Sequence, residues 1–321
     1  MTDKEQYREL CAKESSIPIY SRDWWLDCVC GENKWDVLLC RNKEDIEAAF
    51  PFYIPYKRGI AMPPFTQTMG IWFNPELENQ NYSRNLLRKQ VICEQLIRRL
   101  PEHTFFVQNF NYLFTDWLPF YWNGYRQTTR YTYVLPDIRN IETIENKYND
   151  NLRRNINNAR TKYQMEIKTH LPIEQFLEID AKTYERQRKK TYKPELLRRL
   201  IEMAYTRNQG NTWGAFDPAG QLHAAVFAVW QENCAYYIAG GSDSTGRKSG
   251  AHLLVLSEAI REVSKYSVSF DFEGSMIPGV ERVFRSFGAI QKPYFMISKG
   301  NRPWLCRILK GFGNFFQTHF K

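Results

Sequence analysis

The sequence predicts a mixed α/β fold, with helices packed on a sheet whose strands are partly antiparallel. Three observations lead to this class. Apolar residues alternate at period two in some short segments and recur every three or four residues in others. Strand pairs joined by tight turns interrupt the alternation of strands and helices, which disfavours a doubly wound parallel sheet. The length of 321 residues suits about two domains.

The second half carries the clearest signals. It begins with a strand and two helices, continues with three strands in hairpin succession, and ends with helix, strand, short helix and strand. Gly210 closes the second helix, and Asp217 to Gly220 forms a turn signal between strands. The predicted strands are 164–170, 211–216, 221–230, 234–241, 268–272 and 293–299, and the helices are 172–190, 193–210, 249–266 and 278–287.

The first half follows a similar order with weaker signals. Its predicted strands are 34–40, 46–56, a bent strand 59–73, 104–110 and 128–135, and its helices are 21–30, 82–100 and a short helix or turn at 117–125. The shared order predicts two tandem domains of one architecture, at 1–137 and 138–300. A polar helical segment begins near Pro136, and residues 301–321 form a basic amphipathic tail.

Composition limits the partners and the compartment. A formal net charge of +9 predicts attraction to anions such as nucleic acid, phosphorylated small molecules or anionic lipid. The chain has no apolar run long enough to span a membrane, and its polar N-terminus does not resemble a secretory signal. Seven scattered cysteines predict reduced thiols and a cytoplasmic protein. The tail predicts a docked helix or, alternatively, peripheral contact with an anionic membrane.

A glycine-rich stretch, GGSDSTGRKSGAHLLVL, follows the strand 234–241 and leads into a helix. Free backbone N–H groups at a helix N-terminus suit phosphate oxygens, and glycine allows close approach. Arg247 and Lys248 add positive charge, and Ser249, Gly250 and Ala251 begin the helix. The stretch therefore predicts a phosphate site, unless it is a flexible loop before an ordinary helix.

Two carboxylates end the next strand, in FDFEGS. Alternation at period two places Asp271 and Glu273 on one face of that strand. Beside a cleft, loss of hydration would raise the pKa of such a carboxyl towards that of a general base. The alternative is that they pair with Arg282 or Arg285 of the following helix and serve only the fold.

A third group of polar residues lies in NLRRNINNARTK. Its apolar residues occupy one helical face and leave Arg153, Arg154 and the adjacent Asn155 available. Such a helix would hold a diphosphate or an RNA backbone, or would simply be solvated. The five histidines are dispersed, so the sequence predicts no metal site, and it has no nucleophile-elbow, zinc-protease or Walker motif.

The element order, the Arg-x-x-Gly-Ala pattern at 247–251 and the FGA ending at 287–289 resemble the GNAT acyltransferases. The resemblance implies that backbone amides at 247–251 grip the pyrophosphate of acyl-CoA, with acetyl-CoA the expected donor. It also implies that the strand 234–241 parts from its neighbour and admits the thioester. His252 stands where that pattern usually has a small residue.

The tandem domains, the helix 151–162 and the FDFEGS…FRSFGA ending resemble the Fem-type branch of that fold. This branch includes BioF2-like acyltransferases and aminoacyl-tRNA-dependent peptidoglycan-bridge transferases. Its usual ending has a lysine where this chain has Val283 and Phe284. The first half lacks a glycine-bearing loop, so we expect it to shape the acceptor site without binding a donor. The missing lysine and the absence of a coiled-coil arm favour acyl-CoA as donor, whereas the charge favours tRNA.

We therefore expect an acyltransferase that moves an acyl group from acyl-CoA to an amine or hydroxyl, and the resemblance implies that this acceptor belongs to a cell-envelope precursor. Glu273 is the candidate base, supported by Asp271, and Tyr294 is a candidate proton donor or a core residue. The candidate substrate-binding residues are Arg153, Arg154, Asn155 and Arg285. The alternatives are an aminoacyl-tRNA-dependent Fem-type aminoacyltransferase and a non-catalytic module that binds RNA or a phosphorylated ligand.

Overall fold

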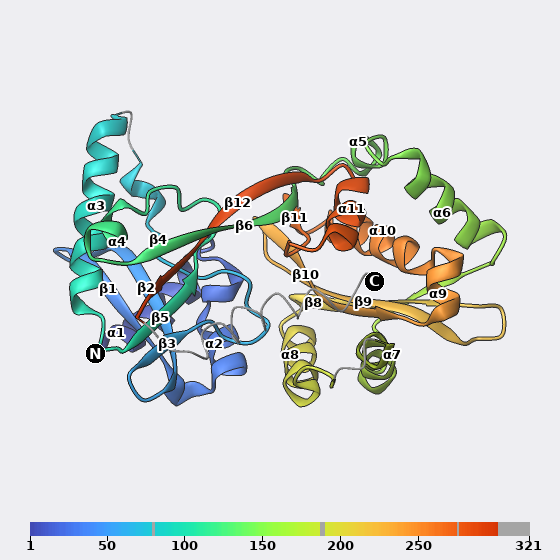
Figure 1. The fold of residues 1–321 in the computed structure, drawn as a ribbon, viewed down its shortest axis with the longest axis horizontal. Helices are drawn as coiled ribbons and strands as arrows, with labels where there is room; N and C mark the ends of the chain where they lie inside the picture. The colour runs from blue at the N-terminus through green and yellow to red at the C-terminus, as the bar shows by residue number, and fades with distance from the viewer. Residues whose placement is uncertain (79–80, 187–189, 275, 301–321) are drawn as a thin grey trace. The chain divides into compact units, whose positions relative to one another are not determined.

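A computed structural model describes residues 1–78, 81–186, 190–274 and 276–300 (Figure 1). Two compact units are present. The first comprises Met1–Arg130 and the described residues from Pro293 onwards, and the second comprises Tyr131–Lys292. The predicted tail 301–321 lies outside the described residues. Within the described ranges, no helix is long and apolar enough to cross a membrane.

The sheet of the first unit has the order β1-β2-β3-β5-β12, and β4 pairs with β2. Its strands are β1 (Trp35–Asn42), β2 (Asp45–Tyr56), β3 (Gly59–Ala61), β4 (Trp72–Phe73), β5 (Phe105–Asn109) and β12 (Ile290–Lys299). Its helices are α1 (Asp3–Lys13), α2 (Asp23–Cys30), α3 (Tyr82–Arg99) and α4 (Leu118–Trp122), with single 3₁₀ turns at Ile19–Ser21, Glu32–Lys34 and Pro75–Leu77. β12 begins in the second unit and supplies the last strand of the first sheet, where it runs antiparallel to β5.

Helix α1 was not predicted from the sequence, because its apolar pattern is weak. It begins with a capping box: the Glu5 N–H donates to Thr2 Oγ1 at 3.2 Å, and the Thr2 N–H donates to Glu5 Oε2 at 2.6 Å. These two bonds satisfy N–H groups that a helix start leaves without partners. Tyr7 and Cys11 then bury the inner face of the helix. Local capping therefore replaces a strong apolar stripe as the cause of this helix.

The predicted bent strand 59–73 was wrong. Only β3 and β4 at its two ends are strands, and the residues between them form a buried irregular segment. Phe65 and Gly70 adopt positive φ angles of 52° and 106°, which no strand accommodates. Polar groups within the segment are satisfied by neighbours: Trp25 Nε1 donates to Thr66 Oγ1 at 2.9 Å.

The second unit confirms the predicted mixed α/β class. Its sheet has the order β6-β11-β10-β9-β8-β7, with an antiparallel meander from β7 to β10 and a parallel β10–β11 pair. The strands are β6 (Arg126–Leu135), β7 (Glu166–Thr169), β8 (Gly210–Phe216), β9 (Leu222–Trp230), β10 (Cys234–Ser242) and β11 (Ser269–Asp271). The helices are α5 (Ile141–Glu145), α6 (Asp150–Thr161), α7 (Ile173–Arg186), α8 (Pro194–Thr206), α9 (Ser244–Ser249), α10 (Ala251–Val263) and α11 (Pro278–Ser286).

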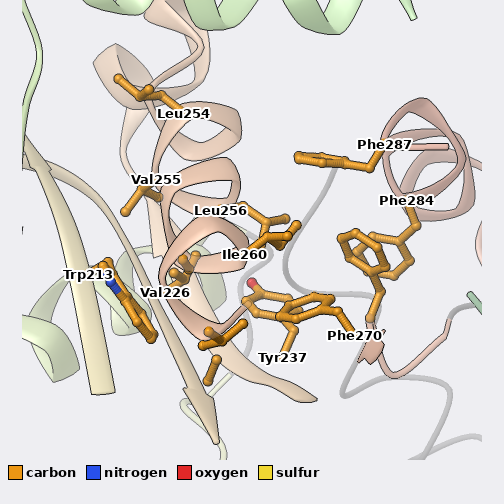
Figure 2. Close-up of a cluster of buried hydrophobic side chains, with 14 of the residues drawn as sticks. Trp213, Val226, Tyr237, Leu254, Val255, Leu256, Ile260, Phe270, Phe284 and Phe287 are labelled. Carbon is orange, nitrogen blue, oxygen red and sulfur yellow. The ribbon is translucent and has the colours of Figure 1, made fainter. Parts of the chain in front are cut away.

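Helices cover both faces of this sheet. Figure 1 shows α7 and α8 on one face and α10, with α6 and α11, on the other. Because both faces are covered, β9 and β10 are buried almost throughout and read as continuous apolar runs. The core between the sheet and α10 contains Trp213, Val226, Tyr237, Leu254, Val255, Leu256, Ile260, Phe270, Phe284 and Phe287 (Figure 2).

Candidate functional site

Strands β10 and β11 separate soon after they meet. They pair in parallel over three residues only, Cys234–Tyr236 with Ser269–Asp271. β11 then ends, whereas β10 continues to Ser242 and remains paired with β9. The β9–β10 register shifts between Tyr237 and Ala239, which marks a β-bulge at the point of separation. A β-bulge redirects side chains and locally disrupts strand pairing, so it accompanies the separation of β10 from β11.

Aromatic side chains meet where the two strands separate. The ring centroids of Tyr237 and Phe284 lie 6.5 Å apart, and Phe272 stacks on Phe284 at 4.9 Å. Figure 2 shows Tyr237 beside Phe270, with the α11 phenylalanines facing them. Burial raises the pKa of Tyr237 well above its usual range, so the phenol stays neutral. The separation of β10 and β11 thus has an apolar, aromatic lining.

Asp271 is the last residue of β11 and is only 1% exposed. Its Oδ1 accepts hydrogen bonds from Thr132 Oγ1 of β6 and, at 2.8 Å, from the Glu273 N–H. Burial raises the pKa of Asp271 to about 7, although these two hydrogen bonds act to lower it. Asp271 therefore links the Glu273 backbone to Thr132 of β6 through two hydrogen bonds.

Glu273 is also 1% exposed, and among the described residues its Oε1 has no hydrogen-bond partner. Burial raises the pKa of Glu273 well above the usual range of a glutamate, and no nearby charge offsets that effect. Asp271 and Glu273 are held together through the backbone N–H of Glu273. The result is an enclosed carboxyl group that favours its protonated form.

The backbone at Glu273 explains its placement. Glu273 has a φ angle of 62° and Gly274 one of 64°, so two successive residues are left-handed. A Cβ on Gly274 would lie 2.2 Å from the Tyr131 carbonyl oxygen, so the chain passes directly over β6. A non-glycine residue in this conformation is uncommon and often marks a functional position.

Two sequence expectations for this segment were wrong. Glu273 does not continue the alternation of the strand, because β11 ends at Asp271 and the next turn is left-handed. Neither carboxyl group pairs with Arg282 or Arg285 in the described structure. Arg285 instead binds Glu281 one helical turn earlier on α11, with Nε 2.9 Å from Oε1.

The glycine-rich stretch is not a loop. Helix α9 occupies Ser244–Ser249, so Arg247 and Lys248 lie in its last turn with their side chains exposed. Gly250 ends α9 in a left-handed conformation, with its N–H bonded to the Gly246 carbonyl, and α10 begins at Ala251. The Ala251 N–H in turn donates to Ser249 Oγ at 3.3 Å.

This turn packs closely against α6. Ser249, Gly250 and Ala251 are buried, and the N–H groups of Gly250 and Ala251 already have acceptors. A Cβ on Gly250 would lie 2.7 Å from the backbone carbonyl oxygen of Asn155 in α6. Gly250, which has no Cβ, therefore allows this close approach of α6.

Helix α9 is fixed by a buried histidine that sequence reasoning missed. Asp243 caps α9 by accepting from the Gly246 N–H at 2.8 Å, and its other oxygen lies 2.8 Å from His223 Nδ1. His223 Nε2 lies 3.1 Å from Asp217 Oδ2. Burial lowers the pKa of His223, but the hydrogen bonds to Asp243 and Asp217 outweigh it and raise the pKa above 6.5. Only the fold brings together these residues from a turn, a strand and a helix cap.

Helices α6 and α9 pack against each other, and each carries exposed basic side chains. We define the α6–α9 basic surface as Arg153, Arg154, Arg247 and Lys248, all of which are exposed. Arg153 Nη2 donates to the Asn146 carbonyl at 2.7 Å and Arg247 Nη1 to the Ser242 carbonyl at 2.8 Å. These bonds use part of each guanidinium and leave other N–H groups for a ligand.

Two further candidates are Asn155 and Tyr294. The Asn155 amide donates to the Asn151 carbonyl at 2.8 Å, so that side chain closes its own helix turn. Tyr294 lies on β12 in the first unit and is buried. Among the described residues, no group of three or more histidine, cysteine, aspartate or glutamate side chains is arranged to hold a metal ion.

Comparisons with known proteins agree with this architecture. Residues 146–279 match the family model described as "Acetyltransferase (GNAT) domain". The comparison with curated proteins found no match. The chain is similar to a crystal structure of FemX, with 9% identity and a TM-score of 0.67 over 92% of this chain and 96% of that one.

Two further solved structures share the fold. L-PGS from Bacillus licheniformis is 10% identical with a TM-score of 0.56, over 99% of this chain and 98% of that one. A tandem GNAT protein from the clavulanic acid biosynthesis pathway is 10% identical with a TM-score of 0.50, over 94% and 97% of the two chains. The matched residues 146–279 include Gly250, Asp271 and Glu273. Residues 146–279 therefore correspond to a GNAT acetyltransferase domain, which supports an acyltransferase, and the fold of the chain is similar to that of FemX and of a tandem GNAT protein.

Proposed function

We propose that the second unit transfers an acyl group from an activated ester to an amine or hydroxyl acceptor, with Glu273 as general base. The observation that carries this proposal is the enclosed Glu273 carboxyl group, which has an oxygen without a partner among the described residues and a left-handed backbone. Such strained, desolvated ionisable groups cluster at catalytic sites. Asp271 acts as a positioning residue, because it holds the Glu273 N–H.

The proposed transfer balances without a further reactant. The acceptor nitrogen or oxygen attacks the carbonyl carbon of the acyl donor, and a new C–N or C–O bond forms. Ionised Glu273 takes the proton that the acceptor loses and delivers it to the leaving oxygen of the donor ester as that C–O bond breaks. Because burial raises the pKa of Glu273, the carboxylate is a stronger base than a solvated one.

The geometry favours the aminoacyl ester of a tRNA as the donor. The α6–α9 basic surface offers four exposed cations on two contacting helices, a pattern that suits a phosphodiester backbone. The turn at Ser249–Ala251, where a diphosphate was expected, is closed by Asn155. An RNA backbone needs no access to the buried N–H groups of that turn.

Filter binding with aminoacyl-tRNA tests the donor. Binding by the wild-type protein should weaken strongly as salt is added. The double variant Arg153→Ala/Arg154→Ala should reduce the slope of the logarithm of the binding constant against the logarithm of the salt concentration by about one per arginine. Lys265→Ala, an exposed lysine beyond the far end of α10, is the matched control and should leave the slope unchanged. Equal slopes for all three proteins would reject the α6–α9 basic surface as the RNA site.

Acetyl-CoA is the second candidate donor, because the matched family model describes an acetyltransferase domain. Here the leaving atom is the sulfur of CoA, and the exposed Arg247 and Lys248 side chains would bind its phosphates. Calorimetric titration with acetyl-CoA separates the two donors. Micromolar binding that Arg247→Ala/Lys248→Ala abolishes would replace tRNA by acetyl-CoA in the proposal.

For the acceptor we propose an amine or hydroxyl of a cell-envelope precursor, as the Fem-type resemblance implies, and for the compartment the cytoplasm. Incubation of the protein with radiolabelled aminoacyl-tRNA and candidate precursors, followed by mass spectrometry, identifies the acceptor. The expected product carries one aminoacyl group in amide or ester linkage. Release of free amino acid with no acylated product, whatever precursor is supplied, would contradict this acceptor class.

A further inference from the structure

Helix α4 in the first unit is apolar on its outer face. Pro119 and Phe120 point inward, and Phe120 joins the core of the unit. Leu118, Tyr121 and Trp122 are 42%, 60% and 54% exposed. The Tyr121 ring contacts Trp117, with the ring centroids 5.4 Å apart, but all three side chains still present apolar surface to water.

Neighbouring segments extend this face. Helices α3 and α4 pack against each other (Figure 1). Just before α4, Asp116 Oδ2 accepts a hydrogen bond from Gln90 Nε2 at 2.8 Å. Exposed apolar residues flank Gln90 on α3, and another lies before α4. We define the α3–α4 patch as Leu87, Val91, Leu113, Leu118, Tyr121 and Trp122, all of which are exposed.

Cations lie beside the α3–α4 patch. Arg84 is exposed in the first turn of α3, and Arg126 is exposed shortly after α4. Lys299 Nζ donates to the carbonyl of Asn123, the C-cap of α4, at 2.8 Å. Within the described part of the chain, none of these three cations forms a salt bridge with a carboxylate. Together with the Asp116 carboxylate between α3 and α4, the charged groups named at the patch sum to a net positive charge.

We propose that the α3–α4 patch docks on an anionic lipid surface. Tyrosine and tryptophan, whose rings combine an apolar body with a polar group, prefer the headgroup level of a bilayer, and leucine extends below it. The rim cations are complementary to anionic headgroups. In a two-fold dimer built on the patch, the same cations would face one another, which disfavours self-association as the explanation.

Co-sedimentation of the full-length protein with phosphatidylcholine vesicles, with and without phosphatidylglycerol, tests this proposal. We expect binding only when phosphatidylglycerol is present. The double variant Tyr121→Ser/Trp122→Ser should weaken that binding by about tenfold or more, because membrane affinity scales with the apolar area inserted. Tyr56→Ser, at an exposed aromatic residue outside the α3–α4 patch, is the matched control and should bind as wild type does.

Other outcomes overturn the proposal. Unchanged vesicle binding by the double variant would place the lipid contact elsewhere, for instance in residues 301–321. A wild-type dimer that the double variant converts to monomers would make the patch an interface between copies. Circular dichroism and the melting temperature verify that the double variant folds. Acyl transfer to a soluble acceptor should be unchanged in the double variant, so this test is independent of the proposed function.

Discussion

Substituting Gly250 by alanine distinguishes a closed helix turn from an open phosphate site. The new Cβ would lie 2.7 Å from the Asn155 carbonyl oxygen and 3.2 Å from the Asn155 Cβ, both in helix α6. The φ angle of 81° adds a second penalty, because a residue with a side chain rarely adopts it. Gly220 provides the matched control: its φ angle is also 81°, but no atom lies within 4 Å of an added Cβ.

The two substitutions separate the two costs. Gly220→Ala should lower the free energy of unfolding by about 1 to 2 kcal/mol, the cost of a left-handed backbone with a side chain. Gly250→Ala carries the same cost and a further ~1 to 3 kcal/mol, because the Asn155 backbone must move to remove the overlap. The expected total for Gly250→Ala is thus about 2 to 5 kcal/mol.

Urea unfolding followed by circular dichroism measures both variants against wild type. The difference between Gly250→Ala and Gly220→Ala is the quantity of interest, since the backbone cost cancels in it. A difference near zero would refute the reasoning, because it would mean that α6 does not close the turn. Calorimetric titration with acetyl-CoA on the same proteins then shows whether an open turn binds the donor phosphates.

Three further predictions concern buried polar groups. Glu273→Gln should lower kcat/KM by about a hundredfold or more. The wild-type rate should rise with pH through the raised pKa of Glu273, whereas the rate of the variant should not change with pH. A variant with wild-type activity would exclude Glu273 as the base. His223→Gln should cost about 2 kcal/mol, because two hydrogen bonds to carboxylates are weakened. Since the pKa of His223 is raised and that of Asp217 lowered, this stabilisation is complete between about pH 4 and 6.5. The stabilisation is lost as pH rises through the folded-state pKa of His223 or falls through that of Asp217. If the difference in unfolding free energy between wild type and His223→Gln, measured in urea, did not change with pH, the assigned pairing of His223 with the two aspartates would be wrong. Thr132→Val should lower the free energy of unfolding by about 1 to 2 kcal/mol, since a hydrogen-bond donor to the Asp271 carboxylate is removed. The same loss should raise the pKa of Asp271 above its value of about 7. Carboxyl ¹³C NMR measures that pKa, and an unchanged value would reject the role assigned to Thr132.

The mixed sheet was predictable from the sequence because its signals are local. The antiparallel strands β8, β9 and β10 follow from short apolar runs separated by turn residues such as Asp217–Gly220. The long helix α10 follows from apolar residues spaced by three and four. Both depend only on neighbours within a few positions. Apart from helix α9, the predicted order of strands and helices from β7 to β12 therefore agrees with the structure.

The candidate site was only partly predictable. FDFEGS singled out Asp271 and Glu273, but not the left-handed turn that separates them from the strand or the bond from Thr132, which is 139 positions away. The pairing of His223 with Asp217 and Asp243 was missed, because each residue alone is an ordinary turn or strand residue. Contacts between distant positions leave no periodic trace in a single sequence.

The sequence alone thus determined the fold class, the resemblance to GNAT acyltransferases and the residues at which chemistry was to be sought. Only the tertiary structure decided how those residues act. It closed the turn at Gly250 with the Asn155 carbonyl and enclosed Glu273 above β6. The physical reason is that periodicity and turn chemistry act over a few residues, whereas burial and close approach depend on which distant segments the fold brings together.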